Sequence, residues 1–133
     1  MMSRQKDDAI TERMRAERRA REAEATPLWV REFGPEYDIP KIIMREPGVI
    51  DLSYKHDACP SFSFRGCTGG DGDLIEVRLW VEHPDRDARE GNVPRYAVCH
   101  HTLDVVLYDG DDLAEALRVW RLACQTAFHV SDL

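Results

Sequence analysis

The chain has 133 residues, of which 43% are hydrophobic and 32% are charged, and its formal net charge is −7. This length and composition fit one globular domain with its own hydrophobic core. No apolar run approaches the ~20 residues of a membrane-spanning helix, and the charged N-terminus is unlike a secretory signal. We therefore expect a cytoplasmic protein without a membrane partner, whose four cysteines are reduced thiols.

The charge divides the chain into two parts. Residues 1–25 hold seven basic and six acidic side chains, a net charge of +1, so residues 26–133 carry −8. An acidic body disfavours non-specific contact with nucleic acid phosphates and suits basic protein partners. We expect a charged helical arm at 1–25 and a single α+β domain at 26–133.

The arm is rich in alanine, glutamate and arginine and lacks glycine and proline over residues 4–25, which favours a helix. Its apolar face is thin, because Ile10 and Met14 align and only alanines follow. So little apolar surface does not pack into a core by itself. The segment is therefore either a solvated arm or a helix that docks on another surface.

A short helix is predicted over residues 26–34, directly after the arm. Thr26 can cap it, Pro27 suits the first helical position, and a glycine–proline pair ends it. Trp29 and Phe33 lie four residues apart on one side of this helix, and we expect them to dock it onto the body.

Alternation of apolar and polar residues predicts strands over most of the remaining chain. The segments are a short edge strand at 42–44 and longer alternating runs at 49–55, 61–65, 74–83 and 95–109. The last run forms either one long strand or two short ones. The sequence GGDGD at 69–73 is typical of a hairpin connection.

The C-terminal segment from residue 112 is the most distinct helix. Asp112 and Glu115 form a capping box, and a single stripe follows at helical spacing, made of Leu113, Leu117, Trp120 and Cys124. Just before it, Leu103, Val105 and Leu107 alternate and are expected to share its core. The fold class predicted is α+β, an antiparallel sheet of about four strands with this helix packed on one face.

Cys99, His100 and His101 are consecutive and could support chemistry. On a strand, Cys99 and His101 point to one face and His100 to the other, so the three do not form one cluster. A cysteine nucleophile needs an adjacent base, which could be His101 oriented by Glu82 or Asp104. No spacing fixes those partners, so we expect a structural role for Cys99, no catalytic residue and no enzyme activity.

A zinc site is the alternative for the same region. His56, Cys59, Cys67 and Cys99 could supply four ligands of suitable softness. None of the cysteines has the C-x-x-C spacing that makes structural zinc sites recognisable. We therefore expect no bound metal or cofactor and keep this set as the alternative.

The arm concentrates basic side chains at residues 13–21, where five arginines face one glutamate. These are Arg13, Arg15, Arg18, Arg19 and Arg21. Flanking acidic residues dilute the positive field, and no aromatic residue lies within the segment to stack bases. A solvated helix face is favoured over contact with nucleic acid.

A short chain with an acidic body and no catalytic signature is similar to accessory proteins carried by phages and mobile elements in GC-rich bacteria. The likeness is one of overall composition and involves no defined motif. It implies a non-enzymatic protein-interaction module that binds and modulates a host protein. The expected contact surface is the five arginines together with Trp29 and Phe33, because arginine and aromatic residues are enriched at binding hot spots. The alternative is a zinc-stabilised domain that contacts nucleic acid through the arm.

Overall fold

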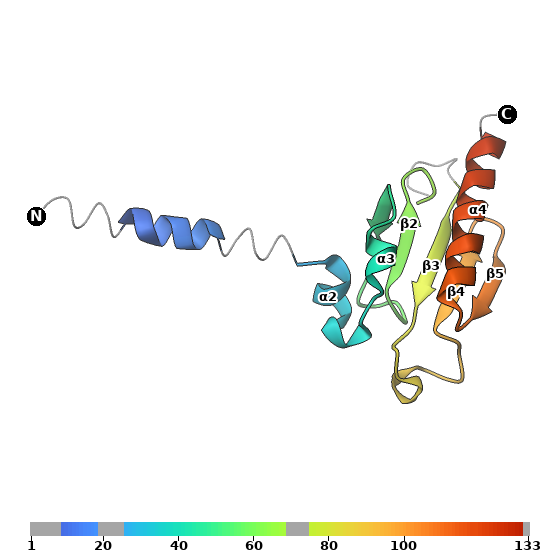
Figure 1. Cartoon of the computed structure of the whole chain (residues 1–133), viewed down its shortest axis with the longest axis horizontal. Helices are drawn as coiled ribbons and strands as arrows, with labels where there is room; N and C mark the ends of the chain where they lie inside the picture. The colour runs from blue at the N-terminus through green and yellow to red at the C-terminus, as the bar shows by residue number, and fades with distance from the viewer. Residues whose placement is uncertain (1–8, 19–25, 69–74, 132–133) are drawn as a thin grey trace, which may run out of the picture.

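The computed structural model of the chain describes residues 9–18, 26–68 and 75–131, with side chains up to Gln125. Within these ranges the fold is an α+β arrangement, a five-stranded antiparallel sheet with the long helix α4 (Leu113–Ser131) across one face (Figure 1). In chain order the neighbouring strands are β1 (Val49–Asp51), β2 (Ser61–Phe64), β3 (Val77–Val81), β4 (Tyr96–His100) and β5 (Val105–Gly110). The predicted fold class is confirmed, with one strand more than expected.

The segment 95–109 forms two short strands, which is one of the two arrangements expected for it. A turn at residues 101–104 separates β4 from β5, and Asp104 adopts a left-handed backbone there, with φ 54°. Such a conformation reverses the chain and ends the strand.

The expected edge strand at 42–44 is wrong, because these residues belong to the short helix α3 (Lys41–Met44). Ile43 is fully buried and Ile42 is half exposed. One helical turn places only one of these side chains in the core.

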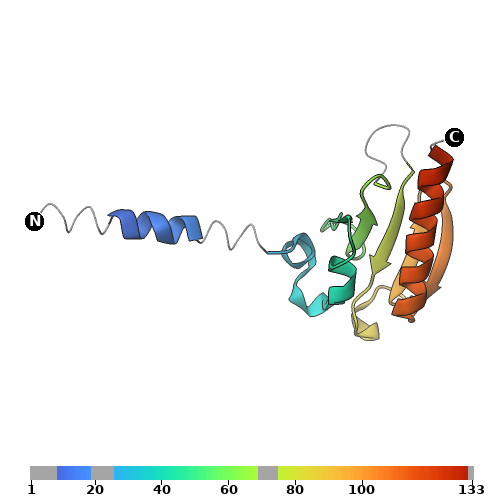
Figure 2. The ribbon, with the colours of Figure 1, turned by 45° about the horizontal axis from the view of Figure 1, so that its top comes forward.

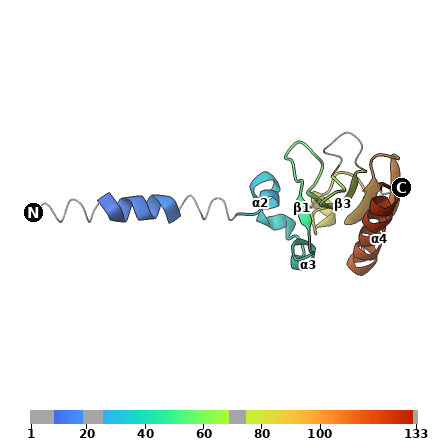
Figure 3. The same cartoon turned by 90° about the horizontal axis from the view of Figure 1, so that it is seen from above.

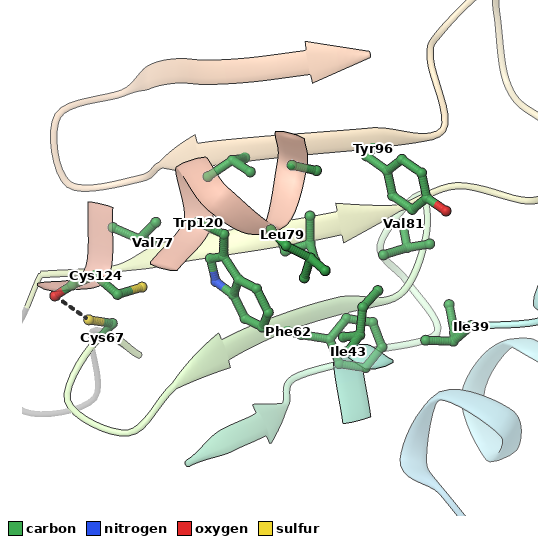
Figure 4. Packing of buried hydrophobic residues seen from close by; sticks show 13 residues of the cluster. Ile39, Ile43, Phe62, Cys67, Val77, Leu79, Val81, Tyr96, Trp120 and Cys124 are labelled. Atoms are coloured by element: carbon green, nitrogen blue, oxygen red, sulfur yellow. Dashed lines mark hydrogen bonds between the residues drawn. The ribbon is translucent and has the colours of Figure 1, made fainter. Parts of the chain in front are cut away.

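The core forms between α4 and the sheet, and the predicted helical stripe is confirmed. Leu117, Trp120 and Cys124 are buried, and the strand β3 presents Val77, Leu79 and Val81 to them. The Trp120 indole has no exposed surface and stacks on Phe64 with 4.1 Å between ring centroids. Figure 4 shows this ring reaching from α4 toward Phe62 and Leu79.

The start of α4 contains the first of the two hydrogen bonds that define the predicted capping box. The Asp112 carboxylate accepts a hydrogen bond of 3.3 Å from the Glu115 backbone N–H. This contact satisfies one of the four amide groups that have no partner within the helix.

The expectation that Leu103, Val105 and Leu107 share the core is wrong, since all three are exposed. Leu103 lies in the turn before β5. The pairing of β4 with β5 shifts register between Val98 and Cys99, so that Tyr108 pairs with Val98 and the next pair is Val106 with Cys99. This bulge puts Leu107 out of phase, and Tyr108 contacts the core instead.

The N-terminal helix α2 (Leu28–Phe33) begins one residue later than predicted, with Pro27 at the cap position in place of Thr26. The Asp51 carboxylate of β1 accepts a 3.0 Å hydrogen bond from the Trp29 backbone N–H. A distant side chain therefore satisfies the first turn of α2 and joins it to the sheet edge.

Arg95 links the turn that follows α2 to the residue that follows β3. Its Nη2 donates to the carbonyl oxygens of Tyr37 and Asp38, which lie in and after the 3-10 turn η1 (Pro35–Tyr37). Its Nε donates to the carbonyl oxygen of Glu82.

Arg89 organises the connection between β3 and β4, which includes the 3-10 turn η2 (Arg86–Ala88). The guanidinium donates to the carbonyl oxygens of His83, Pro84 and Val93, and the side chain is only 4% exposed. Three backbone carbonyl groups of this connection are thus held by one arginine side chain.

Residues 9–18 form a helix in which every residue is exposed (Figure 1). The helix lies where the arm is predicted. Arg19, Arg21 and the GGDGD sequence lie outside the described residues. Across the described ranges, no helix combines the length and apolar character needed to cross a membrane.

Replacement of the central core residue tests the packing of α4. Trp120→Ala should lower the free energy of unfolding by about 3–5 kcal/mol, because it removes a fully buried ring and leaves a cavity. Urea unfolding measures the change. Leu122→Ala on the same helix is the control, since that side chain is 54% exposed and should cost far less. Equal losses for the two variants would contradict this packing.

Deletion of residues 1–25 should leave the body folded, because residues 9–18 are all exposed. The thermal midpoint should change by less than about 4 °C, which is roughly 1 kcal/mol for a domain of this size. A longer deletion of residues 1–34 is the comparison. It also removes α2, whose Trp29 packs against the core, and should lower the midpoint clearly. A large drop for the shorter deletion would show that the arm packs into the body.

Candidate functional site

The sheet has one face without α4, which we call the open face. Figures 2 and 3 show α4 on a single side of β3, β4 and β5. The strand register aligns Trp80, Ala97 and Asp109 on the opposite side, and it also pairs Cys99 with Arg78 and with Val106 there. These six residues define the open face, and Arg78 is the one cation among them.

A pocket of about 380 Å³ lies on the open face, and it is the candidate site. Its apolar lining includes Cys59, Trp80, Cys99 and Val106. Three carboxyl groups also line it, from Asp57, Glu82 and Asp109. Among the described residues, no lysine or arginine lines this open-face pocket.

A second cavity, of about 400 Å³, lies on the α4 side next to Phe64 and Cys124. Its lining includes Glu46 and Arg121, which form an ion pair with each other. Arg65 adds a second basic side chain, so this cavity has a small excess of positive charge, whereas the open-face pocket is lined by three carboxyl groups. The open-face pocket is therefore the stronger candidate for a charged ligand.

Trp80 is held in a fixed position beside the open-face pocket. Its indole Nε1 donates a 3.0 Å hydrogen bond to Nε2 of His101. The Arg78 guanidinium lies 5.6 Å from the centre of the ring and is itself paired with Glu76. This pairing and a cation–π contact restrain both the ring and the cation.

Cys99, His100 and His101 lie in three different environments. Cys99 is half-buried in the pocket, His101 lies in the turn after β4, and His100 accepts a hydrogen bond from the Leu103 backbone N–H through Nδ1. Burial, and then the Asp109 carboxylate, raise the pKa of the Cys99 thiol. A raised pKa lowers the thiolate fraction, which is the opposite of what a cysteine nucleophile requires.

The proposed zinc ligands do not converge. Cys59 and Cys99 line the open-face pocket, whereas Cys67 lies on the α4 side, where its thiol contacts the Cys124 carbonyl oxygen (Figure 4). His56 packs edge-to-face against Tyr54. Within the described ranges, no group of three or more His, Cys, Asp or Glu side chains could hold a metal ion.

Cys59 is a neutral thiol in a buried position. Burial and the nearby Glu82 carboxylate both raise the pKa of Cys59. Burial also raises the pKa of Glu82 itself, against the opposing effects of a hydrogen bond from Cys59 and of the Arg89 charge. Zinc binding needs deprotonated thiolates, which this environment disfavours in the absence of metal.

The predicted contact residues occupy two separate places. Arg13, Arg15 and Arg18 lie on the exposed helix of residues 9–18. Trp29 is half-buried against the core, and Phe33 packs on Tyr37 with 5.3 Å between ring centroids. The aromatic rings of α2 therefore dock this helix onto the body, as expected, and keep part of their surface accessible.

An exposed apolar strand borders the open face, which was not expected from the sequence. The residues, with their exposed fractions, are Leu103 (68%), Val105 (47%), Val106 (59%) and Leu107 (41%). We call these residues the β5 edge. The sequence signal for this exposed strand is the run of three apolar residues at 105–107, because consecutive strand residues point to opposite faces and at least one must lie outside the core.

No protein-family model matches the chain, and the comparisons with curated proteins and with solved structures give no significant match. The chemistry of the open face is thus the basis for assigning a function.

Replacement of Asp109 tests the electrostatics of the pocket. Asp109→Asn should lower the pKa of Cys99 and speed its alkylation by iodoacetamide near neutral pH, because the neighbouring carboxylate raises that pKa. Peptide mass spectrometry follows modification of Cys99 separately from the three buried cysteines. Asp104→Asn is the control, because Asp104 does not contribute to the shift. An unchanged rate in Asp109→Asn would contradict the placement of this carboxylate.

Proposed function

We propose that the chain is a non-enzymatic protein-interaction module that binds and modulates a partner protein. The main contact surface is the open-face pocket together with the β5 edge. The observation that carries the proposal is the run of exposed apolar side chains along the β5 edge, of which Val106 lines this pocket. Contiguous exposed apolar surface in a small domain is typical of an interaction site.

The chemistry of the open face supports binding in preference to catalysis. The two thiols in the pocket, Cys59 and Cys99, have raised pKa values, so they remain protonated at neutral pH. Nε2 of His101 accepts the hydrogen bond from Trp80. A general base must be able to receive a proton from the nucleophile, and this nitrogen is already engaged.

The partner we propose is a host protein with a basic surface, as expected for a phage or mobile-element accessory protein that acts in the cytoplasm. The domain outside the arm has a net charge of −8, which favours association with positive surfaces. The four cysteines are free thiols, which suits a reducing compartment. The arm arginines and the accessible parts of Trp29 and Phe33 would add contacts outside the open face.

A comparison of variants in affinity capture from host lysate tests the function. Val106→Lys introduces a charge at the centre of the β5 edge, and Ile42→Lys introduces the same charge on α3, where Ile42 is also exposed. A specific partner should be recovered with the parent and with Ile42→Lys. Its recovery with Val106→Lys should fall at least about tenfold, the equivalent of ~1.4 kcal/mol.

Equal recovery with both variants would exclude the open face as the contact surface. A version lacking residues 1–25 then assigns any remaining binding either to the arm or to the body.

A further inference from the structure

We propose that the partner adds a basic, extended segment as a sixth strand beside β5, with a lysine or arginine side chain in the open-face pocket. The inference rests on the proposed function and specifies the mode of binding and the chemistry of the ligand.

The first argument is the free edge of the sheet. In the described sheet β5 pairs with β4 alone, so the outer side of its backbone has no strand partner. Unpaired edge strands offer backbone donors and acceptors to an extended peptide. The opposite edge, β1, has only three residues, and its Asp51 binds the start of α2. The longer β5 is therefore the better template.

The second argument is the direction of the side chains. In a strand added to β5, every second side chain points toward the open face. On that face Val106 and Asp109 are the β5 residues that line the pocket. Neighbouring strands lie about 4.8 Å apart, so a long side chain of the added strand can reach over Val106 into the pocket.

The third argument is the charge of the pocket. Three carboxyl groups line it, and no cationic side chain from the described residues does. Val106 provides apolar surface for the aliphatic part of a lysine or arginine, while the Asp109 carboxylate, which also lies on β5, can bind its charged end. The pocket therefore fits a long cationic side chain better than an acidic or purely apolar one.

Two other occupants fit less well. The strand β5 of a second copy, with the sequence VVLYDG, has no lysine or arginine to place in the pocket, and its Asp109 would add a further carboxylate. Like charges brought close together across a strand pair are destabilising. The arginine-rich arm of a second copy is helical at residues 9–18, so it does not present the extended backbone that an edge strand binds.

Fluorescence anisotropy with a short labelled peptide of alternating arginine and valine tests the inference on the full chain. The parent should bind this peptide and should not bind the same peptide with glutamate in place of arginine. Val106→Lys should weaken binding at least about tenfold, and Asp109→Asn about two- to fivefold. Ile42→Lys should bind like the parent.

N-methylated peptides distinguish strand addition from simple charge attraction. Methylation of alternate backbone amides blocks hydrogen bonding on one side of an extended peptide only. One peptide is methylated on the odd-numbered amides and a second peptide on the even-numbered amides. One of the two should lose binding, and the other should bind like the unmodified peptide. Equal binding of the two methylated peptides, or binding that is unchanged by Val106→Lys and Asp109→Asn, would overturn the proposed mode.

The remaining outcomes separate this inference from the proposed function. Failure of the parent to bind the peptide overturns the strand mode. If captured host protein still depends on Val106, the interaction function stands. If it does not, the open face is not the contact surface, and both the strand mode and the proposed surface fail. A dimer of the parent in analytical ultracentrifugation that Val106→Lys dissociates would show that a second copy occupies the β5 edge.

Discussion

The contact of Trp120 with the sheet determines the shape of the whole domain. Its indole is completely buried against Phe64 and fixes α4 over one face, although its Nε1 finds no hydrogen-bond partner within the described structure. An unpaired buried donor costs about 1–3 kcal/mol, so burial of the large ring must outweigh that penalty. Because α4 is the one long helix packed on the sheet in the described ranges, the opposite face of β3–β5 stays without a helical cover.

Local patterns predicted the elements whose environment is uniform along their length. The apolar residues of β3 and of α4 all face the same core, so the spacing of apolar residues was sufficient to predict both elements. Prediction failed where distant contacts decide the outcome. A bulge moves Leu107 out of phase, and the Asp51 carboxylate determines where α2 begins.

The same limit applies to the candidate site. The sequence identified Cys99 and His101 as neighbours on one side of a strand, but their environment depends on the pairing of three strands. The register brings Asp109 close enough to raise the pKa of Cys99, and Trp80 engages His101. Neither contact follows from spacing within one segment. Leu103, Val105 and Leu107 were assigned to the core for a related reason, since a period of two cannot show where a bulge interrupts it.

Arg89 has a consequence for the kinetics of association. Its guanidinium binds three carbonyl oxygens of the β3–β4 connection, including that of Val93, and Val93 and Pro94 form part of the pocket wall. That wall is therefore in place before a ligand arrives. Binding of the proposed partner would therefore lose little conformational entropy at this side of the pocket, and the encounter would not have to wait for a loop to close.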